Sequence, residues 1–85
     1  MTLNLGSSKT LLFARDNGAT ITTDTLNVVS IVENPIRRLI VVFIAELSKP
    51  VILYKGTAYD NLGNYTRLEL RNKLLEVINA EFVQP

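Results

Sequence analysis

The first two thirds of the chain alternate β-branched or other apolar residues with polar ones, a pattern typical of β-strands. Residues 9–15 predict a first strand, and an Asp-Asn-Gly turn at residues 16–18 is typical of a tight hairpin. The threonine-rich residues 19–25 predict the return strand, whose half-polar character favours an edge strand able to add to a partner's sheet. Residues 26–33 predict a third strand, which ends before Pro35 because proline cannot donate to a ladder.

Residues 37–46 are the most apolar part of the chain and predict a strand with two apolar faces. The alternating side chains form two sets: Leu39, Val41, Phe43 and Ala45 on one face, and Ile40, Val42 and Ile44 on the other. Residues 51–54 predict the last strand, which is antiparallel to its predecessor because the connection is short. A strand of this kind needs cover on both of its faces.

The end of the chain carries a helical pattern over residues 67–82. Thr66 is a favourable N-cap, and Glu69 stands three residues later, which is the spacing of a capping box. Glu69 and Lys73 are four residues apart, in the order that favours an ion pair. One apolar stripe runs along the predicted helix: Leu70, Leu74, Val77, Ile78 and Phe82. The pattern predicts a surface helix that lies on a sheet.

These elements predict a single α+β domain over residues 1–85, β-rich in residues 1–64 and helical in residues 66–82. We expect a mostly antiparallel sheet of four to five strands, a small sandwich or partial barrel, with one C-terminal amphipathic helix. Because one helix covers only one face of a sheet, the second apolar face needs another cover. The N-terminal hairpin can fold over it, or a neighbouring subunit can. Leaving three large aliphatic side chains exposed would forgo about 5–8 kcal/mol of burial.

Composition narrows the classes of function. The chain has 85 residues and a net charge of +1, with no cysteine and no histidine. These absences exclude disulfides, thiolate or imidazole metal sites and histidine acid–base chemistry. The balanced charge disfavours a nucleic-acid partner, since phosphate neutralisation dominates such binding. With no catalytic or phosphate-binding motif at proper spacing, we expect no enzymatic activity and no cofactor. A core this small is commonly reinforced by oligomerisation or assembly.

The N-terminal segment has no basic region followed by a long apolar stretch, so we expect no signal peptide. The longest apolar run, residues 39–45, is far shorter than the ~20 residues of a membrane-spanning helix. The sequence therefore predicts a soluble protein made in the cytoplasm, with no membrane partner.

Two kinds of residue are candidates for an interface. Tyrosines surround the loop between the last strand and the helix, and tyrosine is enriched at interfaces because it joins apolar area to a polar tip. Tyr65 is better explained as a seal between helix and sheet. The second set of side chains on the apolar strand is the other candidate. The predicted interface residues are Tyr54, Tyr59, Ile40, Val42 and Ile44.

Residues 51–60 (VILYKGTAYD), followed by Gly-Asn-Tyr-Thr at residues 63–66 and a helix, resemble a pattern in small proteins of tailed bacteriophages and prophages. The resemblance covers about the last third to half of the chain and includes no catalytic residue. It implies a structural virion protein, such as a capsid decoration, neck or tail-completion subunit, that contacts other subunits or itself. The rival hypothesis is a small intracellular binding module, for instance a phage-encoded inhibitor of a host protein.

Overall fold

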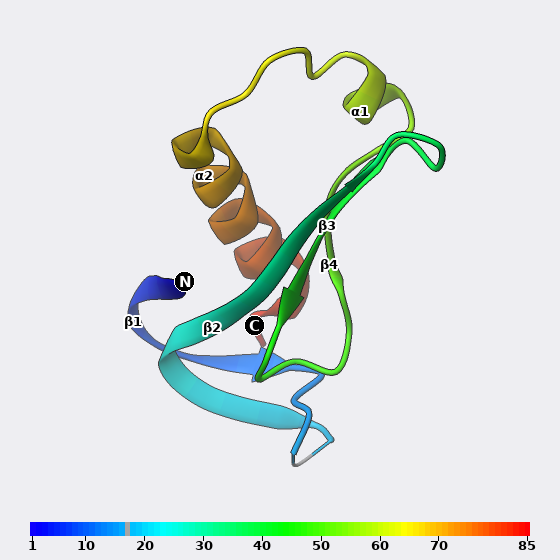
Figure 1. The fold of residues 1–85 in the computed structure, drawn as a ribbon. Coiled ribbons are helices and arrows are strands. Elements are labelled where there is room, and N and C mark those ends of the chain that lie inside the picture. Colours follow the sequence, from blue (N-terminus) through cyan, green and yellow to red (C-terminus); the bar gives the residue numbers. More distant parts are fainter. Residues whose placement is uncertain (17) are drawn as a thin grey trace.

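The computed structural model describes residues 1–16 and 18–85 and has an α+β fold (Figure 1). One antiparallel sheet contains the strands in sequence order: β1 (Thr2–Leu12), β2 (Thr20–Asn34), β3 (Leu39–Ile44) and β4 (Val51–Lys55). The helical segments follow: α1 (Thr57–Asp60), α2 (Arg67–Val77) and a π-helical turn, η1 (Ile78–Phe82). The predicted antiparallel sheet with a C-terminal helix is confirmed, with four strands. None of the helices in the described residues has the length and apolar character needed to cross a bilayer.

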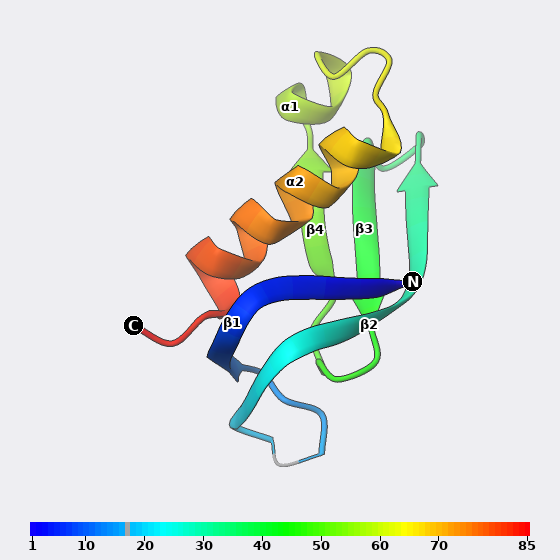
Figure 2. The ribbon, with the colours of Figure 1, turned by 90° about the vertical axis from the view of Figure 1, so that its left-hand side faces the viewer.

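β2 is one strand of 15 residues where the sequence predicts two. Residues 20–27 pair with β1, and residues 28–34 pair with β3 on the other side. The register shifts at Val29, where the strand changes partner, and a bulge of this kind lets a strand bend. The sheet therefore curls into a half-barrel, and in Figure 2 the first half of β2 runs across the direction of β3 and β4. The predicted edge strand is instead part of an inner strand.

The first strand of the N-terminal hairpin is longer than the sequence predicts and begins closer to the N-terminus. β1 begins at Thr2 and ends at Leu12, so it starts seven residues earlier and ends three residues earlier than the predicted strand. Asn17 of the predicted turn lies outside the described residues. After β1 the chain is held against the loop between β3 and β4, where Ser48 donates to the carbonyl of Phe13 through its backbone N–H (2.7 Å) and its hydroxyl (2.9 Å). Phe13 has a φ of 62°, which these contacts hold in place.

The helix begins where its cap predicts. Thr66 Oγ1 accepts a hydrogen bond of 3.2 Å from the backbone N–H of Glu69, and α2 starts at Arg67. Together α2 and η1 reach Phe82, so the predicted span of residues 67–82 is confirmed. Lys73 makes its ion pair with Glu76 (3.5 Å), however, instead of the predicted pair with Glu69.

One core joins the helix to the inside of the curled sheet. All five residues of the predicted helical stripe are buried in it. They pack with side chains from every strand, which include Leu3, Leu11, Leu26, Ile40, Val42 and Val51. The N-terminal hairpin therefore lies on the same side of β3 and β4 as α2. It does not cover their opposite face.

Candidate functional site

The face of β3 and β4 that points away from α2 is open. In Figure 1, α2 lies on one side of this part of the sheet, and no described element lies on the other. Large apolar side chains remain accessible there: Val32, Phe43 and Ile52 are 41%, 41% and 44% exposed. With the half-buried Leu39 and Val41 they line a groove of about 340 Å³. We call these five residues the outer face.

Strand pairing places the outer face across three strands. Val32 of β2 lies opposite Val41 of β3, and Val41 lies opposite Ile52 of β4. Residues that stand opposite each other in antiparallel strands point to the same side of the sheet. Leu39 and Phe43 extend the face along β3, because every second residue of a strand shares a side. The outer face is thus one continuous apolar surface with β3 at its centre.

The predicted interface residues Ile40, Val42 and Ile44 are on the wrong face of β3. They are 0%, 0% and 2% exposed and belong to this chain's own core. The helix and the curled N-terminal hairpin cover this set, which leaves the other set of β3 side chains outside. The sequence indicates that one apolar face needs a second cover, but both sets are apolar, so their composition does not tell which set the helix covers.

The two predicted interface tyrosines also lie away from the outer face. Tyr54 lies opposite Ile40 and packs against the core, with the Lys73 ammonium 5.5 Å from its ring centroid. Simple alternation would place Tyr54 beside Ile52, but a bulge at Leu53 turns it to the helix side. Tyr59 is half-buried against the same core. Both tyrosines hold the fold together, and Tyr65 packs against the core as predicted.

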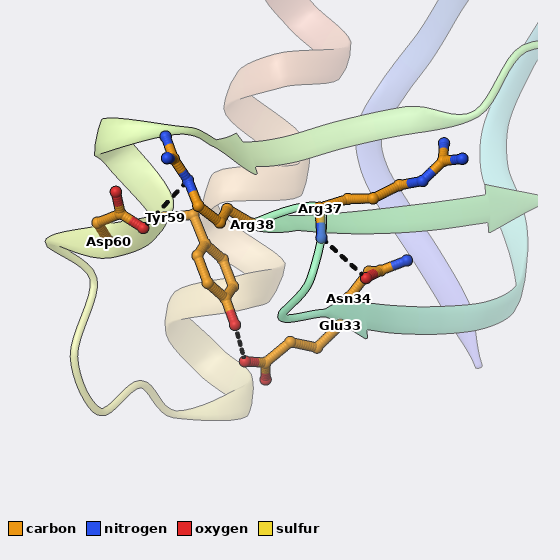
Figure 3. A network of polar contacts seen from close by, with 6 residues as sticks. All are labelled: Glu33, Asn34, Arg37, Arg38, Tyr59 and Asp60. Atoms are coloured by element: carbon orange, nitrogen blue, oxygen red, sulfur yellow. Dashed lines mark hydrogen bonds and ion pairs between the residues drawn. The ribbon is translucent and has the colours of Figure 1, made fainter.

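A polar cluster fixes α1 and the loop before α2 to the end of the sheet. The phenol groups of Tyr59 and Tyr65 both donate to the Glu33 carboxylate, each at 2.5 Å. Figure 3 shows Tyr59 reaching from α1 to Glu33, and Arg38 paired with Asp60 at 3.4 Å. Tyr59 and Tyr65, two of the tyrosines around this loop, therefore serve the chain's own fold by bonding to Glu33.

The hydrogen bonds of this cluster displace pKa values in opposite directions. The bond from Tyr59, and then that from Tyr65, lowers the pKa of the Glu33 carboxyl, because both stabilise its charged form. The bond to Glu33 raises the pKa of Tyr59 to about 12 and also raises the pKa of Tyr65. A lowered carboxyl pKa stabilises the fold above the ordinary value of 4.5, and this contribution is lost as the pH falls through the folded pKa. The raised pKa of the Tyr59 phenol stabilises the fold below pH 10, and this stabilisation is lost as the pH rises through about 12.

We therefore expect Glu33→Gln to lower the melting temperature at neutral pH. Wild-type and variant melting curves should converge in acid, below the folded pKa of Glu33, because the carboxylate is then protonated in the wild type too. Absorbance titration of the three tyrosines should show the highest transition moving down from about 12 in the variant. Glu81→Gln, an exposed acid on η1, is the matched control and should leave the titration unchanged. An unchanged highest transition in Glu33→Gln would show that the cluster does not persist in solution.

Sequence reasoning missed the residues that are in fact exposed. Val32, Phe43 and Ile52 were assigned to strands but not to an interface. Ile36, in the turn between β2 and β3, is 93% exposed, and a large aliphatic residue next to a proline turn is a signal that the sequence does offer. Knowing which face α2 covers would have identified the other three.

The site is an apolar surface on a small α+β half-barrel. In residues 1–16 and 18–85, no three acidic side chains come together as metal ligands would. The chemistry that the outer face offers is contact with another apolar surface. Comparison of the chain with protein-family models, with curated proteins and with solved structures found no match.

Proposed function

We propose that the chain is a non-enzymatic assembly subunit that docks on a different protein through its outer face. The observation that carries the proposal is the row of Val32, Phe43 and Ile52, each about two fifths exposed on one open side of the sheet. Contiguous exposed apolar surface of this kind marks interaction sites in soluble proteins. The resemblance to small virion proteins of tailed phages supports one particular form of this role, a capsid decoration, neck or tail-completion subunit.

Covering the outer face with a partner would add burial energy that stabilises this small domain. Full burial of a large apolar side chain is worth about 1.5–3 kcal/mol, so covering the remaining two fifths contributes about 1 kcal/mol for each of the three. A total of about 3 kcal/mol is a large fraction of the stability of a domain this small. Docking would thus strengthen both the complex and the fold of the subunit.

The test is sedimentation of the chain with native particles or complexes from the cells that make it. We expect the wild type to sediment with large assemblies in many copies, as quantitative mass spectrometry of the fractions would record. The double variant Phe43→Thr, Ile52→Thr should remain folded, because both positions are half-exposed and threonine suits a strand. It should move to the top of the gradient.

Leu68→Gln is the matched control, since Leu68 is an exposed apolar residue on α2, 62% exposed, and lies outside the outer face. This variant should sediment like the wild type. A wild-type chain found only as a free monomer, or bound to a single cellular enzyme, would contradict the assembly role and favour the inhibitor hypothesis. Unchanged sedimentation of the double variant would show that docking uses another surface.

A further inference from the structure

The dimensions of the outer face match the footprint of one helix. From Leu39 to Phe43 the face runs four residues along β3, or about 13 Å at the rise of a strand. Three strands spaced about 4.8 Å apart make it about 10 Å wide, which is the diameter of an α-helix with its side chains. The opposite side of the same sheet already carries a helix, α2, with its stripe of buried leucine and valine residues. A helix aligned with β3 would cover the open side with about nine residues.

Cations flank both ends of the outer face. Arg37 lines the groove at the Leu39 end, and its side chain extends back along the strands in Figure 3. Lys55 stands opposite Leu39 and is exposed. At the other end, Arg15 and Lys49 line a second hollow next to Phe43. Among the described residues that line the groove and the second hollow, every charged side chain is basic.

Two acidic side chains near β3, those of Glu33 and Glu46, are turned away or already bound. Glu33 stands opposite Ile40 on the helix side and accepts from the two tyrosines. Glu46 follows β3, but its carboxylate accepts hydrogen bonds from the backbone and the side chain of Asn27, both at 2.8 Å. Within residues 1–16 and 18–85, Arg15, Arg37, Lys49 and Lys55 form no ion pair. Arg15 donates to two backbone carbonyls, and the Lys49 ammonium lies over the Phe13 ring.

We propose that the outer face binds an amphipathic helix of a different protein, with an apolar stripe of about nine residues between acidic residues at both ends. This inference rests on the proposed docking role and names its partner by chemistry. A second copy of the chain is disfavoured, because two outer faces placed together bring cations against cations in either relative direction. Acidic residues on the partner satisfy the same cations and steer its approach.

The test uses two synthetic 16-residue amphipathic helices with the same leucine and alanine stripe, one ending in glutamates and one in lysines. We expect the glutamate peptide to bind at least about tenfold more tightly in calorimetry at low salt, and more weakly as salt is raised. Amide NMR shifts should map its contact to Val41, Phe43 and Ile52. The variant Arg37→Glu, Lys55→Glu should abolish the preference between the peptides, because one end of the face is then acidic while Arg15 and Lys49 keep the other end basic. Sedimentation of the wild type alone should show a monomer.

Arg67→Glu with Arg71→Glu is the charge-matched control, since both residues are exposed on α2, and it should keep the wild-type preference. Four results with the wild-type chain would each overturn the inference: equal binding of the two peptides, binding of neither, contacts mapped to α2, or a dimer held by the outer face. These outcomes leave the assembly role standing if Phe43→Thr, Ile52→Thr still abolishes sedimentation with particles. If that double variant keeps its place in the gradient, the assembly role through this face fails whatever the peptides do.

Discussion

Replacing Ile40 with aspartate is expected to prevent the chain from folding. Ile40 lies on the inner strand β3, is 0% exposed and packs in the core that α2 shares with the sheet. An ionised carboxylate without a partner in such a place costs several kcal/mol, on top of the lost burial of the isoleucine. Small domains have total stabilities near the lower end of about 5–15 kcal/mol. Circular dichroism should show no cooperative melting, and the NMR spectrum should lose its dispersion.

Phe43→Asp is the matched comparison on the same strand. Phe43 is 41% exposed on the outer face, so an aspartate there keeps its carboxylate in water. We expect this variant to fold with a moderately lowered melting temperature, from lost apolar contact and the poor strand propensity of aspartate. Loss of folding in both variants would mean that the outer face is not open. A folded Ile40→Asp protein would mean that the two faces of β3 are assigned the wrong way round.

Phe82→Ala is expected to lower the free energy of unfolding by about 3–5 kcal/mol, the range for removing a buried aromatic ring. Phe82 is 1% exposed, and its ring centroid is 5.6 Å from that of Phe13 in an edge-to-face contact. The Lys49 ammonium lies 5.7 Å from the Phe82 ring and 4.7 Å from the Phe13 ring. Removing the ring therefore leaves a cavity and also loosens the contacts of Phe13. Urea denaturation would measure the change through the transition midpoint.

The loss should spread to the end of the chain in a way that hydrogen exchange can detect. Val83 forms a bridge with Leu11, and the backbone N–H of Gln84 donates to the Thr10 carbonyl at 2.8 Å. Both contacts directly follow Phe82, so the amide of Gln84 should exchange faster in the variant. Leu68→Ala, at an exposed position of α2, is the control and should change stability by no more than about 0.5 kcal/mol. Equal effects of the two substitutions would contradict the placement of η1 in the core.

The helix was the most predictable element, because its signals are local. A capping threonine, a glutamate three residues later and an apolar stripe at helical spacing act within a few turns of one segment. They predicted both the start at Arg67 and the burial of the five stripe residues, which the structure confirms. The Glu69–Lys73 pair was not realised: the Lys73 ammonium pairs with Glu76 at 3.5 Å, and the Glu69 carboxylate accepts a hydrogen bond from the Thr66 hydroxyl at 3.3 Å.

The strands were predicted as segments, and the N-terminal hairpin and the antiparallel pairing of β3 with β4 were predicted with them, but the bulges and the bend of β2 were not. Residues 19–25 and 26–33 are one bent strand, since the curl that joins them depends on the bulge at Val29 and on two different partners. Another bulge, at Leu53, moved Tyr54 to the helix side. A bulge is set by the fit between neighbouring strands, and it reverses the side on which the following residues point. Periodicity within one segment does not reveal it.

The sequence by itself determined that this chain is a small α+β protein with a C-terminal helix and a strand with two apolar faces. The uninterrupted apolar run of β3 indicated the two apolar faces, because burial of apolar area drives folding whichever side it comes from, and the cap and stripe of residues 66–82 indicated the helix. Only the tertiary structure decided which set is buried and which forms the outer face. The hairpin curls toward α2 instead of folding over the opposite side, so Ile40, Val42 and Ile44 are buried in the core. Val32, Phe43 and Ile52 are left exposed.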